Sequence, residues 1–347
     1  MERTLLDTPR ATGLAMPAEW VEHERTLMAW PARLELWGDR LADAKRDYAA
    51  IARAIAAFEP VLMVAEPGAR AEVRRRCGRG VEVLELPIDD SWIRDSGPIF
   101  VTASGGRRAG VDFRFNGWGG RFEPCDRDDA MPRALLDQLG VDRFEAPFVL
   151  EGGSVCVDGE GTLITTEQCL LNPNRNPELE REQIEALLAD YLGIETVVWL
   201  PHGLVEDNDT DGHVDNVAAF VEPGRVLLQT VADVASPNHE PLQENLELLR
   251  AATDARGRQI EVVELDVLPA SEVRGLPGCV PYTNLYIANG AVIVPVSGDD
   301  PDRDEQVLGM LGELFAPREV VPVPGEMLAE GGGGVHCITQ QVPVVWS

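Results

Sequence analysis

The stretch TDGHVDNVAAFVEPGRVLLQ, residues 210–229, sets the pattern of the whole chain. A polar turn leads into a short apolar strand, and a tight turn then leads into a second apolar strand. The same order recurs in four other segments: DDSWIRDSGPIFV (89–101), LEGGSVCVDGEGTLITT (150–166), YTNLYIANGAVIVPV (282–296) and GGGGVHCITQQVPVV (331–345). In three segments the turn is a hairpin signal, at Asp158-Gly159, Pro223-Gly224 and Asn289-Gly290. Recurrence about every fifty to seventy residues predicts a repeated supersecondary unit arranged around an axis.

Helices are expected between these segments. Apolar residues at helical spacing predict a helix over 42–58, which Pro60 ends before a buried strand at 61–65. Asn176-Pro177 predicts the start of a second helix over 178–192, and Gly193 predicts its end. Two more helices are expected at about 242–255 and 304–315. The alternation of strands and helices indicates an α/β fold.

Composition excludes several classes of protein. The 30 basic and 59 acidic side chains give a formal charge of −29, which disfavours nucleic acid and anionic lipid as partners. No apolar run is long enough to cross a membrane, and the N-terminus has no secretory-signal pattern. The six cysteines include no C-x-x-C pair and are expected to be reduced. We therefore expect a cytoplasmic protein, for which a homo-oligomer is compatible with the sequence.

Four of the five segments carry a reactive or charged residue at about the same place. These residues are Asp95, Glu151, His213 with Asp215, and Cys337, whereas the segment at 282–296 offers only Tyr282 and Asn284. Taken singly, each has a structural interpretation: an aspartate paired with a neighbouring arginine, a turn cap, a satisfied His–Asp pair on one strand face, and a buried cysteine beside a flexible glycine run. A closed ring of repeats would instead bring them to a common centre.

Together these residues supply a thiol, an imidazole and three carboxylates. Three carboxylates in one pocket repel each other unless a cation occupies it, and a planar guanidinium suits carboxylates that grip it in pairs. Guanidinium carbon is a poor electrophile, so attack on it needs a strong nucleophile such as a thiolate. The glycine run before Cys337 would let backbone N–H groups lower the pKa of the thiol.

Ordered motifs along nearly the whole chain carry a family resemblance. They are MPAEWVEHERTLMAWP (16–31), DDSWIRDSGP (89–98), FNGWGG (115–120), LEGGSV (150–155), TDGHVDN (210–216), YIANGAVIVP (286–295) and GGGVHCITQQVP (332–343). With these motifs the chain resembles the agmatine deiminases of the peptidyl-arginine deiminase, or guanidino-group-modifying (pentein), superfamily. The resemblance implies a single catalytic domain over 1–347, an α/β five-bladed propeller of pseudo-fivefold ββαβ repeats.

The resemblance also implies the roles of individual residues. Cys337 is the expected nucleophile, His213 the general acid/base, Asp95 and Asp215 the carboxylates that hold the guanidinium, and Glu151 the carboxylate between substrate and histidine. The expected substrate-binding residues are Trp92, Asp209, Trp118 and Gly333. Asp209 stands where the family commonly has Glu, and Gly334 where it usually has Asn, so both departures bear on the tail of the substrate.

The implied reaction is hydrolysis of a small cationic guanidino compound, with agmatine giving N-carbamoylputrescine and ammonia through an S-alkylthiouronium intermediate. Such an enzyme would belong to polyamine metabolism and putrescine biosynthesis, and neither metal nor organic cofactor has an expected role. Alternatives are deimination of peptidyl-arginine or a related small amine, and amidino transfer to an acceptor amine. A metal site of His213, Asp215 and Cys337, and an inactive polyamine binder, are further hypotheses from other classes.

Overall fold

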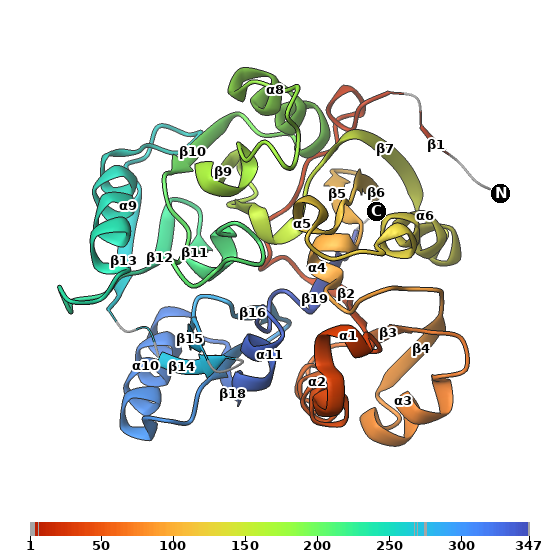
Figure 1. Ribbon diagram of the computed structural model, residues 1–347. Coiled ribbons are helices and arrows are strands. Elements are labelled where there is room, and N and C mark those ends of the chain that lie inside the picture. The colour runs from red at the N-terminus through yellow and green to blue at the C-terminus, as the bar shows by residue number, and fades with distance from the viewer. Residues whose placement is uncertain (1–3, 6, 267, 269, 274–275, 346–347) are drawn as a thin grey trace.

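The structure is a computed structural model that describes residues 4–5, 7–266, 268, 270–273 and 276–345. Within these residues it forms a mixed α/β fold of six small sheets (Figure 1). Five of the sheets share one construction, in which two antiparallel strands are followed by a helix and by a strand that pairs parallel with the second. These pairings match the repeated unit that the sequence predicts.

Each of the five units runs in the order strand, strand, helix and strand. The first two units are β5 (Ile99–Ala103), β6 (Arg107–Arg114), α6 (Asp126–Leu139) and β7 (Asp142–Val149), and then β8 (Cys156–Val157), β9 (Thr162–Thr166), α8 (Arg181–Leu192) and β10 (Thr196–Leu200). The other three units are β11 (Ala218–Glu222), β12 (Arg225–Gln229), α9 (His239–Ala251) and β13 (Glu261–Leu265); β16 (Tyr286–Ala288), β17 (Ala291–Val296), α10 (Pro301–Leu314) and β18 (Glu319–Pro324); and β19 (Thr339–Pro343), β2 (His23–Ala29), α2 (Leu41–Ile55) and β3 (Val61–Ala65). Further elements are β1 (Thr4–Leu5), α1 (Leu34–Trp37), α3 (Arg70–Cys77), β4 (Val81–Glu85), α4 (Ile93–Ser96), α5 (Gly117–Gly120), α7 (Glu167–Leu170), β14 (Ala270–Val273), β15 (Leu276–Cys279) and α11 (Glu326–Glu330).

The predicted hairpins are all present. Glu222 pairs with Arg225 across Pro223-Gly224, and Ala288 pairs with Ala291 across Asn289-Gly290. The strands β8 and β9 are likewise antiparallel on either side of Asp158-Gly159. Gly224 and Gly290 have φ of 77° and 78°, a conformation that glycine adopts without steric cost.

The helices lie where the sequence predicts them, but the start of α8 differs. Asn176 does not cap this helix: its side chain accepts a hydrogen bond from the backbone N–H of Val149 at 2.9 Å and donates to the Val149 carbonyl at 3.0 Å. The helix begins at Arg181 instead, where Glu180 and Gln183 form a capping box. Asn176 therefore fixes the backbone two residues before Glu151.

The hydrophobic core is divided between the sheets and the helices that cover them. Tyr48, Ile51 and Ile55 of α2 are fully buried in one cluster with Met63 of β3. In Figure 1 the strands β11, β16 and β19 lie toward the middle of the molecule, and the helices α2, α8, α9 and α10 lie toward the outside. This arrangement directs the turns that precede the first strands toward a common region.

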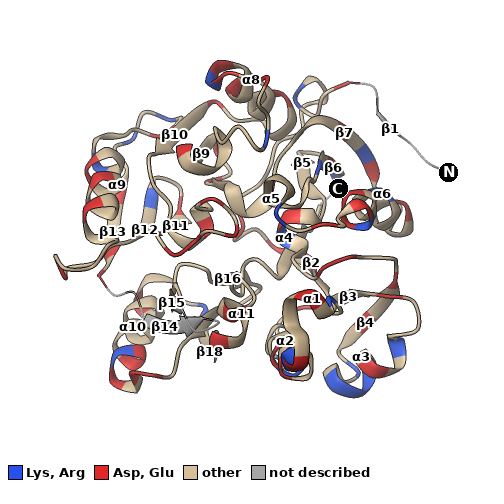
Figure 2. Cartoon of the chain, viewed as in Figure 1, with Lys and Arg blue, Asp and Glu red and all other residues tan. Residues whose placement is uncertain are grey.

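Charge is distributed unevenly over the outer elements (Figure 2). Acidic side chains are spread over most helices, whereas α3 carries the consecutive basic residues Arg74, Arg75 and Arg76. None of the helices in the described part of the chain combines the length and the apolar character that a membrane span requires.

The fifth sheet joins the two ends of the chain. The C-terminal strand β19 pairs antiparallel with β2, and β2 pairs parallel with β3. Cys337 lies two residues before β19, so this pairing holds the cysteine against segments from the N-terminal half. The strand thus positions the site and completes a sheet at the same time.

Deleting residues 339–347 removes β19 but leaves Cys337 in the chain. We expect this truncation to abolish the cooperative unfolding transition, because the lost sheet edge exposes the buried core and a domain has only ~5–15 kcal/mol of stability. Circular dichroism during thermal unfolding measures this, with Cys337→Ser as a control that must melt like the intact protein. A truncated protein with the same melting temperature would show that β19 does not hold the fold.

Candidate active site

Cys337 lies in the turn between α11 and β19 and is 4% exposed. Its Sγ lies 3.3 Å from Nδ2 of Asn284 and 3.4 Å from Oδ2 of Asp215. Burial raises the pKa of the thiol well above its usual range, and the charges of Asp215 and Asp95 raise it further. The backbone N–H of Gly334 opposes this only in part. The N–H of Gly334 thus lowers the pKa of this thiol as expected, but burial and the two carboxylates outweigh it, so the net shift is upward.

The glycine run is closely packed rather than a free surface loop. A Cβ atom added to Gly333 would lie 2.5 Å from the Trp92 ring and 3.1 Å from Cβ of Cys337. At Gly334 it would lie 2.3 Å from Oδ1 of Asn284. The absence of side chains lets this backbone approach the walls of the site.

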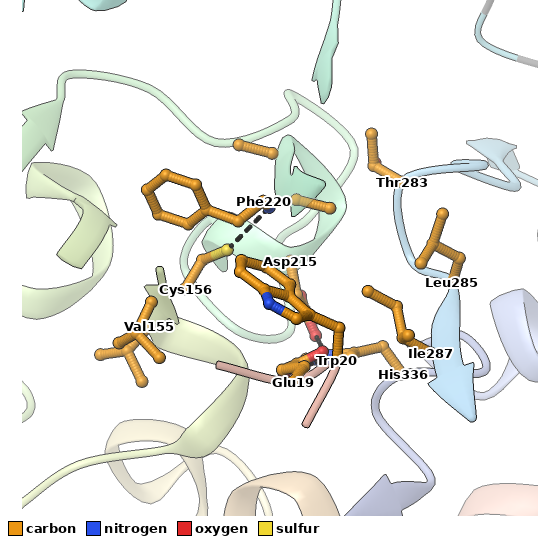
Figure 3. Close-up of a pocket in the computed structure, with 13 residues that line it drawn as sticks. Glu19, Trp20, Val155, Cys156, Asp215, Phe220, Thr283, Leu285, Ile287 and His336 are labelled. Carbon is orange, nitrogen blue, oxygen red and sulfur yellow. Dashed lines mark hydrogen bonds and ion pairs between the residues drawn. The ribbon is translucent and has the colours of Figure 1, made fainter. Parts of the chain in front are cut away.

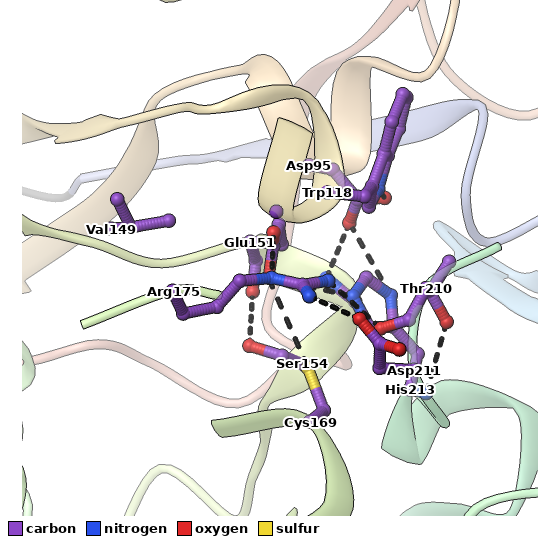
Figure 4. A network of polar contacts seen from close by, with 12 residues as sticks. Asp95, Trp118, Val149, Glu151, Ser154, Cys169, Arg175, Thr210, Asp211 and His213 are labelled. Atoms are coloured by element: carbon purple, nitrogen blue, oxygen red, sulfur yellow. Dashed lines mark hydrogen bonds and ion pairs between the residues drawn. The ribbon is translucent and has the colours of Figure 1, made fainter. Parts of the chain in front are cut away.

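His213 and Glu151 belong to one network of polar contacts (Figure 4). Both side chains are fully buried, and Nε2 of His213 is 3.6 Å from Oε2 of Glu151. On the other side of the ring, Nδ1 is 3.8 Å from Oδ1 of Asp95, and neither ring nitrogen makes a hydrogen bond. Burial alone would lower the pKa of His213, but the charge of Asp95 and contacts with Cys169 and Glu151 raise it well above the usual value. The surroundings of the imidazole therefore favour its protonated form.

The segment that carries His213 is not a strand. His213 precedes a 3-10 turn, Val214–Asn216, so alternation along a strand does not relate it to Asp215. Instead, Oδ2 of Asp215 lies 3.0 Å from Nδ1 of His336. The interpretation as a satisfied His213–Asp215 pair is also wrong, because Asp215 is bonded to His336, whereas the ring nitrogens of His213 face Asp95 and Glu151.

Three of the predicted groups converge on Gly153. A Cβ atom at this position would lie 2.6 Å from Nδ1 of His213 and 2.9 Å from both Oδ2 of Asp215 and Oδ1 of Asp95. Only a glycine leaves room for them. The Gly152-Gly153 pair after Glu151 is thus a requirement of the site, and Glu151 makes no side-chain cap at its turn.

Asp95 is held by two donors from other parts of the chain. Its Oδ2 accepts a hydrogen bond from Nε1 of Trp118 at 2.9 Å, and its Oδ1 accepts one from the backbone N–H of Gly153 at 2.8 Å. Trp118 has a left-handed backbone with φ of 55°, an uncommon conformation for a bulky side chain. The neighbouring Arg94 pairs with Glu19 at 3.1 Å. The pairing of Asp95 with a local arginine is therefore wrong.

Two residues that the sequence analysis missed surround Glu151. Arg175 donates from Nε to Oε1 of Glu151 at 2.8 Å, and its Nη1 lies 2.5 Å from Oδ2 of Asp211. Together with His213, Arg175 outweighs burial and lowers the pKa of Glu151. Cys169 places its Sγ 4.0 Å from Oε2 of Glu151. The polar run that contains Arg175, NPNRNP at 172–177, was the available signal, and it was interpreted only as a helix start.

Asn284 and His336 were also missed as site residues. Asn284 contacts the Cys337 sulfur, and its Oδ1 accepts a hydrogen bond from the backbone N–H of His336 at 2.9 Å. His336 bridges Asp215 and Glu19, with Nε2 2.8 Å from Oε1 of Glu19. Burial alone would raise the pKa of Glu19, but the charges of His336 and Arg94 lower this pKa to about 2. His336 directly precedes the predicted nucleophile, which was the one signal for it.

A pocket of about 330 Å³ opens onto Cys337. The predicted site residues that line this pocket are Trp92, Asp95, Trp118, Asp209 and Cys337. The other residues that line it are Leu36, Asp90, Phe122, Thr210, Gly331 and Gly332. Gly333 is not among the lining residues and lies instead behind Trp92. Burial raises the pKa of Asp90 to about 6 and also raises that of Asp95. The pocket is therefore both acidic and aromatic.

A second cavity, of about 380 Å³, lies on the other side of Asp215 and His336 (Figure 3). Apolar side chains such as Leu285, Ile287 and Phe220 form much of its wall. Asp215 thus contacts the Cys337 sulfur and also borders this cavity.

The predicted set of metal ligands is not the one that the geometry favours. Among the described residues, the metal-ligating atoms that lie within 4.8 Å of one another belong to Glu151, Cys169 and His213. The alternative set of His213, Asp215 and Cys337 does not form such a group.

Known proteins that are similar to this chain show its family. Residues 15–343 match the family model of the Porphyromonas-type peptidyl-arginine deiminases. Agmatine deiminases from Stutzerimonas stutzeri and Pseudomonas aeruginosa are 44% and 45% identical to the chain, and the matches cover 98% and 97% of both partners. A solved structure of an agmatine deiminase from Enterococcus faecalis superimposes with a TM-score of 0.95 at 36% identity, covering 99% of this chain and 100% of that one. The chain therefore belongs to the Porphyromonas-type peptidyl-arginine deiminase family.

Proposed function

We propose that this protein hydrolyses the guanidinium group of agmatine to N-carbamoylputrescine and ammonia. The observation that carries the proposal is an acidic, aromatic pocket that Cys337 and Asp95 line, with Asp215 in contact with Cys337 and with His213 and Glu151 buried next to Asp95. The agmatine deiminases that match the chain over nearly its full length support the choice of substrate.

The pocket suits a ligand with two positive charges. Asp95 and Asp215 would hold the guanidinium, and Oδ1 of Asp215 has no hydrogen-bond partner and is free to accept an N–H. The rings of Trp92 and Trp118 offer faces for the flat cation. Asp90 and Asp209 line the same pocket and would attract the ammonium at the far end of agmatine.

Attack begins with the Cys337 thiol, which is neutral in the free protein. A bound guanidinium would offset the charges of Asp215 and Asp95 that keep the pKa of the thiol high, so the thiol would lose its proton to solvent when substrate binds. The thiolate then attacks the guanidinium carbon and forms a neutral tetrahedral adduct. Protonated His213 gives its proton to one nitrogen, ammonia leaves, and an S-alkylthiouronium intermediate remains.

Hydrolysis of the intermediate restores the enzyme. Neutral His213 takes a proton from water, the water oxygen bonds to the same carbon, and the C–S bond breaks with release of the thiolate. One proton of the water thus goes to His213, and the other is released to solvent when the carbonyl forms, which balances the protonation of the departed ammonia. The thiolate takes up a proton from solvent when the product leaves, which restores the thiol. Glu151, 3.6 Å from Nε2, would keep the imidazole oriented and stabilise its charged form.

The five similar sheets support a closed five-bladed propeller formed by the whole chain as one catalytic domain. In this arrangement the turn before each first strand would face the axis. All six cysteines are free, which fits the reducing cytoplasm as the site of the activity.

The substrate is tested by an ammonia-release screen over agmatine, free arginine, guanidinobutyrate and arginine-containing peptides. We expect agmatine to give the highest kcat/KM, because a second cation can meet Asp90 and Asp209, whereas a carboxylate would be repelled. Product analysis with an added acceptor amine separates hydrolysis from amidino transfer. Preference for guanidinobutyrate or for peptides would overturn the choice of agmatine.

Replacing the nucleophile should abolish turnover. We expect Cys337→Ser to reduce ammonia release roughly 10³-fold or more, because a serine hydroxyl stays protonated at this site. The matched control is Cys156→Ser, which removes a part-buried thiol that accepts a hydrogen bond from the backbone N–H of Phe220 and should retain most activity. Equal loss in the two variants would contradict the assignment.

Asp215→Asn should separate two effects of this carboxylate. Removing its charge should lower the pKa of the Cys337 thiol in the free protein, because Asp215 raises it. Turnover should nevertheless fall by about 10²–10³-fold, because a guanidinium contact is lost. The first effect is measured from the thiolate absorbance as a function of pH, after subtraction of the absorbance of the same protein with Cys337→Ser added. The second effect is measured as the rate of ammonia release. A thiol that is already ionised at neutral pH in the wild-type protein would contradict substrate-triggered activation.

A further inference from the structure

We propose that Glu151, Cys169 and His213 form a binding site for Zn²⁺, and that the bound ion inhibits the enzyme. Oε2 of Glu151, Sγ of Cys169 and a ring nitrogen of His213 lie within 4.8 Å of one another, and all three side chains are fully buried. A carboxylate, a thiolate and an imidazole are the three ligand types that zinc takes in proteins.

The distances require only small movements. From zinc–ligand bond lengths, a tetrahedral ion would separate its nitrogen and oxygen ligands by about 3.4 Å and its sulfur and oxygen ligands by about 3.6 Å. The corresponding separations are 3.6 Å from Nε2 of His213 to Oε2 of Glu151, and 4.0 Å from Sγ of Cys169 to the same oxygen. Sγ of Cys169 lies within 4.8 Å of the ring nitrogen of His213, so rotation of the cysteine side chain toward the imidazole would be the main movement that closes the site.

His213 is the independent sign of a missing ligand. Its imidazole is fully buried, yet neither ring nitrogen has a hydrogen-bond partner, which is costly for a buried polar group. Nδ1 faces Oδ1 of Asp95 at 3.8 Å, an arrangement in which the carboxylate fixes the proton on Nδ1 and leaves Nε2 free to bind a metal. Carboxylate–histidine–zinc arrangements of this kind are common around metal sites.

The surroundings orient the other two ligands and tolerate the added charge. Arg175 holds Oε1 of Glu151 at 2.8 Å and therefore leaves Oε2 for the metal. The arginine does not face the ion unpaired, because Asp211 also holds its guanidinium. Figure 4 shows Cys169 and Arg175 beside Glu151, with His213 directed into the same space. Zinc binding would displace the thiol proton of Cys169 and the second proton of His213 to solvent.

Zinc at this position and catalysis exclude each other. The ion would occupy the imidazole that, in the proposed function, gives a proton to ammonia and takes one from water, and it would also engage Glu151. This inhibitory consequence rests on the proposed function, whereas the binding of zinc does not. Cys169 contributes to the metal site without belonging to the catalytic groups, so it allows the two to be separated.

The binding test uses the full chain with Cys337→Ser, so that the nucleophile cannot supply a ligand. Competition with a chromophoric chelator should detect one zinc ion per chain, and Co²⁺ should give thiolate-to-cobalt charge-transfer absorption. Adding Cys169→Ser should weaken zinc binding at least ~100-fold and remove that absorption, whereas adding Cys156→Ser should change neither. Cys169→Ala serves as a second variant, and thermal melting confirms that each protein is folded. Unchanged zinc affinity without Cys169, or zinc binding only when Cys337 is present, would overturn the site.

The activity test uses the enzyme with Cys337 intact. Zinc should inhibit ammonia release by the wild-type protein, and a chelator should restore it. Because Cys169 contacts Glu151 and influences the pKa of His213, inhibition is compared within each variant. Relative to its own turnover without zinc, Cys169→Ser should need at least about tenfold more zinc for half-inhibition. If zinc binds through Cys169 and turnover is unaffected, the inhibitory part fails together with the proposed role of His213, while the metal site itself stands.

Discussion

The dominant constraint in this molecule is the burial of several carboxylates in one small region. Taking an ionised carboxylate out of water costs several kcal/mol unless charges and hydrogen bonds compensate. The charges and hydrogen bonds that offset this cost differ from one carboxylate to the next. Glu151 has Arg175 and His213, and Asp215 has His336, whereas Asp95 accepts hydrogen bonds from Trp118 and Gly153 and has its nearest cation at 3.8 Å. The local structure around the site, from the left-handed backbone of Trp118 to the glycines, serves to hold these partners in place.

The sequence predicted the elements of the fold well because their determinants are local. Hairpin turns need particular residues, and the helices follow apolar spacing, so both could be recognised one segment at a time. The start of α8 was predicted wrongly for the opposite reason. Asn176 and Pro177 look like a helix start by themselves, but the side chain of Asn176 binds the backbone of Val149, a contact across the fold.

The same distinction explains which parts of the candidate site were recognised. Asp95, Glu151, His213, Asp215 and Cys337 stand at equivalent places in the repeated pattern, and that regularity made them visible. Arg175 lies outside the pattern, between α7 and α8, and reaches Glu151 only through the folding of the chain. Likewise, no spacing rule connects Cys169 with His213. Contacts with distant residues also decide what a candidate residue pairs with. Asp215 was recognised as a candidate, but it pairs with His336 and not with its sequence neighbour His213.

The balance of charge at the centre offers a physical reason for the choice of ligand. The carboxylates linked by ion pairs around the site are Glu19, Asp95, Glu151, Asp211 and Asp215, and the cations paired with them are Arg94, Arg121, Arg175, His213 and His336. The surroundings raise the pKa values of both histidines and so favour their charged forms, which makes the cations equal in number to the carboxylates. A thiolate at Cys337 would add a negative charge without a counter-charge, which agrees with the raised pKa of this thiol in the free protein. A guanidinium cation would supply that counter-charge, so its binding would favour ionisation of the sulfur. The ureido group of the product is neutral and cannot do so, and the ionised sulfur therefore favours retention of the substrate over that of the product.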